Sequence, residues 1–563
     1  MLHAKNYSFS LIFLLFLCLA SSAYAAVGEK AMAVTPDSRA THTALEILKQ
    51  GGNAVDAAVA AEWALQAVCP QSSGIGGGGF FLFYDIGTRR ILFVDGSVKA
   101  PAKSSPEMFL DLKGKLLPYQ PDRSTGGMPV GVPGLLKLTN EVHAKYGTHK
   151  FPFAKLFEPA IRLAEEGTDV SAPLAKALRE NAKRLALLDP QREIFFKQGV
   201  PLEEGAKFSQ PELAKTFRLI QSKGAETFYD GVLATAITQA VQRAAYRPGR
   251  LSERDLEDYR SVERDPVHAT YQGYDLFSAG PPADGGVMFF RSLNILSHFG
   301  IPGLGQVSET YHLLAETQKT ALSNRSGVAD PDMFDVPLKE LLSEAWAQER
   351  AGHIKFDRVL KSSGVPDKNV KNGEKGSGSS IMIVDPHGNI AILSATLGDA
   401  FGSALRVPGY GFFLNDQLTA LASDPASVKD PQSAELISGG QRPHGAEAPL
   451  FIFKEGKPAF LMNAYGSDDP ASVLLNVAVQ KLDLGVSCAG ALAAPRLLVR
   501  DGVLGMEPGL YSQEMIRLKL GLLGHKIEKK ARVGSAQIVC FDEGSGRIDG
   551  ESDPRDTGEA AGF

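Results

Sequence analysis

A glycine-serine loop runs directly into an apolar hairpin at residues 376–403, GSGSSIMIVDPHGNIAILSATLGDAFGS. The apolar runs on both sides of the turn PHG are nearly uninterrupted, so other layers of the fold must cover the hairpin. A self-processing enzyme places a small hydroxyl residue at such a loop-to-strand junction, because cleavage there frees an α-amino group that serves as base for the side-chain nucleophile. The stretch therefore predicts a buried central strand pair and the place where a self-cleavage site would lie.

Helical patterns dominate before residue 350, and hairpins dominate after residue 378. Residues 35–52 predict a capped amphipathic helix, and residues 53–68 predict a second, alanine-rich helix that is tightly buried. Apolar segments predict strands at 79–85, 91–95 and 274–279, three hairpins within 381–397, 450–462 and 496–506, a helix near 511–521 and a last strand pair ending at 553–555. Together they predict an α/β (α+β) fold of layered sheets covered by helices.

The first 25 residues have the pattern of a secretory signal peptide. Lys5 lies in a short n-region, residues 11–20 are apolar, and Ala23 and Ala25 suit cleavage before Ala26. The expected location is periplasmic or secreted. A lipid anchor at Cys18 is the minor alternative, and no stretch approaches the ~20 apolar residues of a membrane span.

Composition excludes several classes of partner and cofactor. A net charge of -5 without a polybasic stretch argues against nucleic acid and anionic membranes as partners. Cys69, Cys488 and Cys540 lack the spacing of a disulfide framework or a zinc site, and the sequence leaves open which two of them pair. The histidines are scattered and form no metal-binding motif, so no catalytic metal is expected. GIGGGG at 74–79 follows a helix and precedes a strand, which argues against a dinucleotide loop and predicts close backbone packing, so no cofactor is expected.

Many collinear motifs resemble the γ-glutamyltranspeptidase (glutathione hydrolase) family. They are LKQGGNAVDAAVAA, PQSSGIGGGGFFLFY, APAK at 100–103, GVPG at 131–134, YDGVLATAITQAV, DYRSVERDP, GPPADGGV, HGNIAILSATLGDAFGS, GFFLND and the closing SDPR. The resemblance implies an N-terminal nucleophile hydrolase fold, a four-layer αββα sandwich. It also implies a large-subunit region at 26–354, a linker or cleavage loop at 355–377 and a small-subunit region at 378–563, interwoven in one domain and remaining associated after any cleavage.

The family's nucleophilic threonine begins the pattern Thr-x-His-x-Ser-Val-Val-Asp. With the register anchored on Val384 and Asp385, that threonine corresponds to Gly378 in this chain. Ser379 is the nearest hydroxyl and becomes the candidate nucleophile, although a shift of one residue turns its side chain to the opposite face of the strand. Ser377 and Ser380 are further alternatives.

Other family positions also differ. The resemblance places Thr396 beside the nucleophile and the amides of Gly466 and Ser467 in the oxyanion hole. It assigns the substrate-binding positions to Ser97, Asn415, Gln417, Gly445 and Ala446, where the family has an arginine at 97 and serines at 445 and 446. The family's asparagine after Thr-Leu corresponds to Gly398, and its amino-binding aspartate corresponds to Ala420.

Two functions of different classes fit these substitutions. The first is an exported protein without γ-glutamyl transfer or glutathione hydrolysis, which binds a small-molecule or peptide acyl ligand or acts as a scaffold. The second is an active, self-processing amidohydrolase or acyltransferase that uses a serine on an acyl group other than γ-glutamyl.

Overall fold

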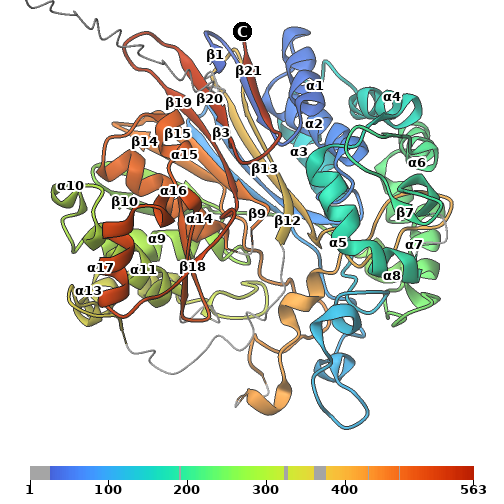
Figure 1. The fold of residues 1–563 in the computed structure, drawn as a ribbon. Coiled ribbons are helices and arrows are strands. Elements are labelled where there is room, and N and C mark those ends of the chain that lie inside the picture. The colour runs from blue at the N-terminus through green and yellow to red at the C-terminus, as the bar shows by residue number, and fades with distance from the viewer. Residues whose placement is uncertain are drawn as a thin grey trace, which may run out of the picture.

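Two antiparallel seven-stranded sheets form the centre of the molecule (Figure 1). The computed structural model describes residues 26–188, 192–322, 327–360, 376–428, 430, 432–467 and 469–563. The predicted signal peptide and residues 361–375 of the predicted linker lie outside the described residues. Both sheets contain strands from before and after the linker, so neither half of the chain completes a sheet alone.

The first sheet has the order β21 (Glu559–Gly562), β2 (Met32–Thr35), β12 (Gly376–Val384), β13 (Ile390–Asp399), β3 (Gly78–Asp85), β4 (Arg90–Gly96) and β9 (Val262–Arg264). The second has the order β1 (Ala26–Gly28), β20 (Ile548–Ser552), β19 (Ser535–Phe541), β15 (Lys457–Tyr465), β14 (Leu450–Lys454), β11 (Tyr274–Ser278) and β10 (Val267–Tyr271). Smaller sheets join β16 (Leu497–Arg500), β17 (Val503–Met506) and β18 (Lys526–Lys529), and pair β5 (Thr168–Asp169) with β8 (Lys207–Phe208) and β6 (Phe196–Lys197) with β7 (Val200–Pro201).

Helices cover the outer face of each central sheet (Figure 1). Beside the first sheet are α1 (Ser38–Lys49), α2 (Ala54–Val68), α3 (Leu135–Tyr146), α4 (Glu158–Glu166), α5 (Ala172–Leu188), α6 (Pro211–Lys223), α7 (Val232–Gln242) and α8 (Glu253–Glu257). Beside the second are α9 (Gly285–Leu296), α10 (Ile301–Leu304), α11 (Ser308–Leu322), α12 (Leu338–Leu341), α13 (Glu344–His353), α14 (Pro470–Ala478), α15 (Cys488–Ala493), α16 (Pro508–Tyr511) and α17 (Glu514–Leu522). The predicted αββα sandwich is confirmed.

Strand β12 shows how alternation separates the apolar cores. Ile381 and Ile383 belong to the core between the first sheet and its helices, whereas Met382 and Val384 belong to the core between the two sheets. Successive side chains of a strand point to opposite faces, so this apolar pattern fixes the register of β12. The predicted cover on both faces of the hairpin is confirmed.

The two N-terminal helices are confirmed with their caps. Asp37 caps α1, and Asn53 forms a capping box with Asp56 at the start of α2. The prediction missed β1, β2, β9 and β10, which have three to five residues each. It also ended the last strand pair at 553–555, whereas β21 follows and pairs with β2. These strands are too short to show a clear alternating pattern, and tertiary pairing creates them.

The glycine run at 74–79 packs against backbone, as predicted. A Cβ atom at Gly76 would lie 2.0 Å from the carbonyl oxygen of Phe413, and one at Gly77 would lie 2.2 Å from that of Thr396. Any side chain there would push β13 and the loop at 413 away, so glycine is required by close approach.

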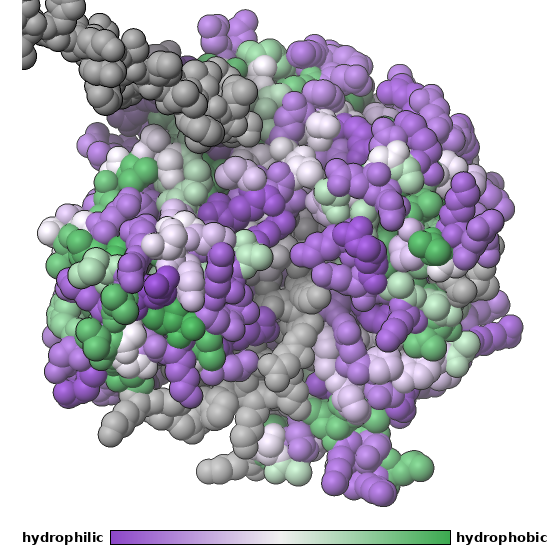
Figure 2. All heavy atoms as spheres, viewed as in Figure 1, coloured by the Kyte–Doolittle hydropathy of each residue, from purple (hydrophilic) through white to green (hydrophobic). Residues whose placement is uncertain are grey.

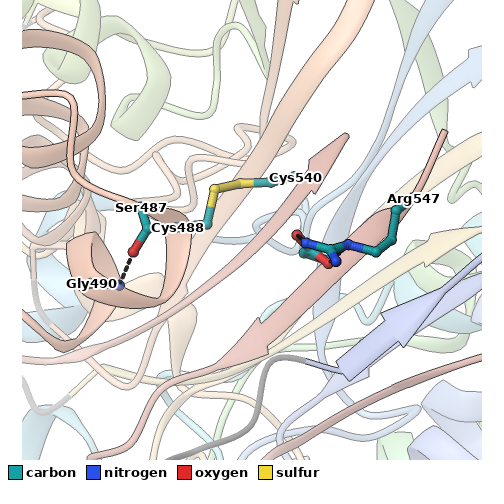
Figure 3. Close-up of a disulfide and its surroundings, with 6 residues drawn as sticks. Ser487, Cys488, Gly490, Cys540 and Arg547 are labelled. Carbon is teal, nitrogen blue, oxygen red and sulfur yellow. Dashed lines mark hydrogen bonds and ion pairs between the residues drawn. A yellow bond between two sulfur atoms is a disulfide. The ribbon is translucent and has the colours of Figure 1, made fainter. Parts of the chain in front are cut away.

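A disulfide joins Cys488 of α15 to Cys540 of β19 (Figure 3). Cys69 is a buried free thiol. Ser487 precedes the bonded cysteine and caps α15 by accepting a hydrogen bond from the Gly490 amide at 3.2 Å. The bond therefore ties the outer helix layer to the second sheet. The sequence left this pairing open because the two cysteines are 52 residues apart.

Hydrophilic residues cover much of the face seen in Figure 2, with apolar residues in small groups between them. Among the described helices, none is long and apolar enough to cross a membrane.

A carboxyl group is buried where α2 packs on the first sheet. Glu62 is fully inaccessible to solvent, and burial raises its pKa to about 8, although the Ser73 hydroxyl donates a hydrogen bond to its carboxyl group and the Ser379 hydroxyl lies nearby. The folded protein therefore holds a proton on Glu62 at a pH where the unfolded chain, with the ordinary value of 4.5, has lost it.

We expect the wild type to lose stability as pH rises, because the folded state keeps a proton on Glu62 that the unfolded chain releases, and we expect Glu62→Gln to lack this loss. The unfolded state binds fewer protons than the native state between pH 4.5 and about 8, so the free energy of unfolding falls as pH rises through this window. The slope is about 1.4 kcal/mol per pH unit for one proton. Urea denaturation at several pH values should give a difference of this sign between wild type and Glu62→Gln. The exposed Glu46→Gln on α1 serves as the control, and parallel curves for wild type and Glu62→Gln would contradict the assignment.

Candidate active-site cavity

A cavity of ≈ 140 Å³ opens where β12 begins and where β13 and β15 end. Its lining contains the predicted residues Ser377, Gly378, Ser379, Thr396, Gly398, Gln417, Ala420, Gly445, Ala446, Gly466 and Ser467. These residues come from five separate segments of the sequence between 377 and 467. The fold therefore brings most of the predicted site residues to one place.

Position 378 lies at an irregularity in the β12–β13 pairing. The register shifts between Ser377 and Gly378, and Gly378 lies opposite Thr396. The Thr396 hydroxyl donates to the carbonyl oxygen of Ser377 at 2.5 Å and accepts from the Gly398 amide at 2.9 Å. The threonine thus contacts the carbonyl of the peptide bond between residues 377 and 378, the bond a nucleophile at 378 would attack.

The three serines next to position 378 occupy different environments. The Ser379 side chain is buried, contacts the Glu62 carboxyl group and lies 3.4 Å from the carbonyl oxygen of Ala395. The Ser377 hydroxyl donates to the Gln71 carbonyl oxygen at 2.8 Å and is half-buried. Ser380 faces the other sheet, where its hydroxyl accepts from the Asn463 amide at 2.9 Å. Ser379 therefore borders the cavity with its hydroxyl directed toward α2.

Glycines at two substituted family positions allow close contacts. A Cβ atom at Gly398 would lie 2.0 Å from Asp416 Oδ1, at a positive φ of 98°. A Cβ atom at Gly445 would lie 2.5 Å from Glu447 Oε2 and 2.6 Å from Phe80 Cε2. Neighbouring groups have thus taken the space of the side chains that the resemblance places there. At Gly378 the nearest atom to an added Cβ is the Ala395 oxygen at 3.2 Å, so that position can accept a side chain with a small adjustment.

The structure does not bring Ser97 or Asn415 into the cavity lining. The Ser97 hydroxyl donates to Asp95 at 2.7 Å, and its carbonyl oxygen accepts from Arg442 at 2.9 Å, within a buried polar group. The Asn415 side chain is fully buried and bonds to the backbone of Gly76 and Gly131. Both residues support the loops that border the site.

Several lining residues were not predicted: Tyr119, Asp399, Asp416, Thr419, His444, Glu447, Tyr465 and Pro470. His444 and Glu447 flank the predicted pair Gly445 and Ala446, so their position in the motif could have indicated them. Tyr119 comes from a short helical segment far away in sequence, with no pattern that marks it.

Two acidic residues of the cavity lining, Asp399 and Asp416, lie near the guanidinium group of Arg184, which is outside the lining. Arg184 lies 3.9 Å from both Asp399 Oδ2 and Asp416 Oδ2, and the Asp399 amide donates to Asp416 Oδ1 at 2.9 Å. Burial, and then the nearby Asp399 charge, raise the pKa of Asp416 well above its usual value. The Arg184 guanidinium group therefore lies within ion-pair distance of both aspartate side chains.

Comparison with known proteins agrees with this architecture. A sequence model described as gamma-glutamyltranspeptidase matches residues 40–563. Glutathione hydrolase proenzyme of Bacillus subtilis (strain 168) is 34% identical over 95% of this chain and 92% of its own length. Acylase ACY 1 proenzyme of Pseudomonas sp. (strain SE83) is 31% identical over 92% of this chain and 90% of its own.

Solved structures show the same relationship. Cephalosporin acylase from Bacillus halodurans superposes with a TM-score of 0.84 at 26% identity, covering 100% of this chain and 99% of that one. Helicobacter pylori gamma-glutamyltranspeptidase superposes with a TM-score of 0.55 at 33% identity, covering 60% of this chain and 95% of that one. Since the sequence match extends over nearly the whole described fold and includes the strands that form the cavity, the chain belongs to the γ-glutamyltranspeptidase family.

Proposed function

We propose that this chain is a ligand-binding member of its family that neither cleaves itself at residues 377 and 378 nor transfers γ-glutamyl groups. Gly378 carries this proposal, because it occupies the nucleophile position and has no side chain. Thr396 still contacts the Ser377 carbonyl, so the surroundings of the peptide bond are kept without the attacking atom.

The environment of Ser379 supports the same proposal. A nucleophile must point toward the atom it attacks, with a base within hydrogen-bond reach. The Ser379 hydroxyl instead contacts the buried Glu62 carboxyl, whose raised pKa of about 8 favours the protonated form below that pH. A protonated carboxyl group is a poor base, so this contact stabilises the packing of α2 on β12 and does not activate the serine.

The cavity lining indicates what class of ligand fits. It contains carboxylates at Asp399 and Glu447 and no lysine or arginine among the described residues that line it. The arginine that the family places at 97 is a serine here, and Ser97 lies outside the lining. Losing charge-assisted bonds to both ends of a glutamyl group, each worth about 1.5 to 3 kcal/mol, weakens its binding at least ~100-fold. We therefore propose an amide ligand without a free carboxylate, and one that tolerates an amine.

The second candidate is an active serine amidohydrolase or acyltransferase of the same family. It is favoured by the presence of Ser377 and Ser379 in the cavity lining and by the acylases among the relatives. Ser379 would need a rearranged strand entry to turn its hydroxyl into the cavity. For either function we propose export to the periplasm or outside the cell, with the mature chain starting at Ala26.

We expect the wild-type chain to stay in one piece after export, whereas Gly378→Thr should cut itself before residue 378. A threonine fits the space at 378 and restores a hydroxyl next to the carbonyl that Thr396 contacts. Intact mass spectrometry after long incubation measures both outcomes. Gly378→Val is the matched control, because it has nearly the shape of threonine and no nucleophile, and it should remain uncut.

A wild-type cut before residue 378 or 379 would contradict the proposal. In that case Ser379→Ala separates the alternatives. Loss of the cut in this variant would support the serine enzyme, and persistence would point to Ser377, Ser380 or another protease.

We expect a carboxylate-free amide to bind more tightly than the γ-glutamyl amide with the same leaving group. The difference should be at least ~10-fold by calorimetry, since an unpaired carboxylate near Asp399 and Glu447 is repelled. An amine-bearing analogue should lose several-fold in affinity on Glu447→Gln, whereas a neutral analogue of equal size should not. Tighter binding of the γ-glutamyl amide would overturn the proposed ligand class.

A further inference from the structure

A buried cluster of ligand-type side chains lies in the second helix layer, outside the cavity lining. His312 and Glu316 are one helical turn apart on α11, and His525 lies between α17 and β18. The three are buried, and one ligand atom from each lies within 4.8 Å of the other two. Among the described residues, this is the one group of three or more His, Cys, Asp or Glu with such geometry.

Backbone groups orient two of the three side chains. His312 Nε2 lies 2.7 Å from the carbonyl oxygen of Lys355, which can only accept, so Nε2 carries the proton and Nδ1 presents its lone pair to the cluster. The Leu360 amide donates to Glu316 Oε2 at 2.7 Å, which leaves Oε1 facing His525. A metal-binding histidine almost always donates its other ring nitrogen to a carbonyl or carboxylate in this manner.

The distances are close to those of a metal site. His312 Nδ1 and His525 Nε2 are 2.8 Å apart, and His525 Nε2 and Glu316 Oε1 are 3.9 Å apart. Ligands about 2.0 to 2.1 Å from a tetrahedral ion are about 3.3 Å from one another. To reach this spacing, the distance between the two histidine nitrogens must increase by about 0.5 Å, and the distance from His525 to Glu316 must decrease by about the same amount. Rotation of the His525 ring can do both.

We propose that His312, Glu316 and His525 bind a divalent transition-metal ion, Zn²⁺ by preference, at a structural site. Two imidazoles and one carboxylate suit zinc, which has no geometric demand of its own, and a water molecule completes four ligands. On binding, the proton on His525 Nε2 relocates to Nδ1 of the same ring, so the ring remains neutral. The ion joins α11, the turn after α17 and the segment at 355–360.

Lys319 is the cation that pairs with this cluster in the absence of metal. Its ammonium group lies 2.5 Å from Glu316 Oε1, and its side chain is 22% exposed, so it can swing toward solvent. A bound metal ion must either displace the Lys319 ammonium group from Glu316 or lie close to its positive charge, which repels the ion. Removing that charge should therefore strengthen metal binding, whereas a purely structural network would lose an ion pair.

The ordinary alternative is a buried hydrogen-bonded network that only packs α11 against α17. Both interpretations predict that removing His525 destabilises the fold, so stability alone does not distinguish them. Metal content and the affinity change on removing Lys319 do distinguish them.

The experiment uses the full chain, purified without chelator from zinc-supplemented medium. We expect close to one zinc per chain by mass spectrometry of the metal, and a rise in Tm when Zn²⁺ is added to chelator-treated protein. Co²⁺ in place of zinc should give the visible absorption of a tetrahedral site. Lys319→Met should bind Zn²⁺ more tightly than wild type.

His525→Gln keeps a hydrogen-bonding side chain but removes a metal ligand. Its affinity for Zn²⁺ should fall by more than the ~10 to 100-fold that is typical when a hydrogen-bond partner of a ligand is lost. The matched control is His268→Gln, which removes an exposed histidine beside Asp275 and should leave metal binding unchanged. A folded wild type with less than about one zinc per ten chains and no cobalt absorption would overturn the proposal. So would weaker binding in Lys319→Met. These two tests hold even if His525→Gln fails to fold.

Discussion

The alternation of side chains along β12 is the constraint on which the rest of this structure depends. Ile381 and Ile383 pack under the helices, whereas Met382 and Val384 pack between the sheets. A shift of one residue would place each pair in the wrong core, so burial on both faces holds the register firmly. The same alternation reaches the start of the strand, where Ser379 is directed to Glu62 and Ser380 to Asn463. Packing thereby decides which groups can take part in chemistry at this end of the sheet.

This constraint also explains how the fold can be kept while the chemical groups change. Nearly all residues of the three cores lie outside the cavity lining, Ala395 and Ala464 being the exceptions among the described residues, so a change of side chain at position 378 removes no core residue. At Gly398 and Gly445 the neighbouring Asp416, Glu447 and Phe80 fill the space instead. The cavity wall is therefore closely packed around Gly398 and Gly445, whereas the space at Gly378 can hold a side chain after a small adjustment.

Much of the architecture could be predicted from periodicity and turn residues. Asp37 and Asn53 mark the starts of two helices, and the glycine run at 74–79 marks a close backbone approach. The short strands β9, β10 and β21 could not be predicted, because their residues have no strong pattern and pair only when the sheets assemble. The residues of the cavity also divide into those that a sequence pattern marked and those that it did not. Most residues within recognisable motifs were brought together, although Ser97 and Asn415 lie outside the lining. Tyr119 and Arg184 come from helical segments without a distinguishing signal.

The sequence by itself determined the family, the layer order and the absence of a side chain at position 378, since these depend on local pattern and residue identity. Only the tertiary structure decided which way Ser379 points, that Ser97 and Asn415 lie behind the cavity, and that Cys488 pairs with Cys540. It also brought His312 and His525 together across 213 residues. The physical reason is that contacts between distant segments depend on how layers pack. No spacing along the chain encodes the distance between two atoms on different layers.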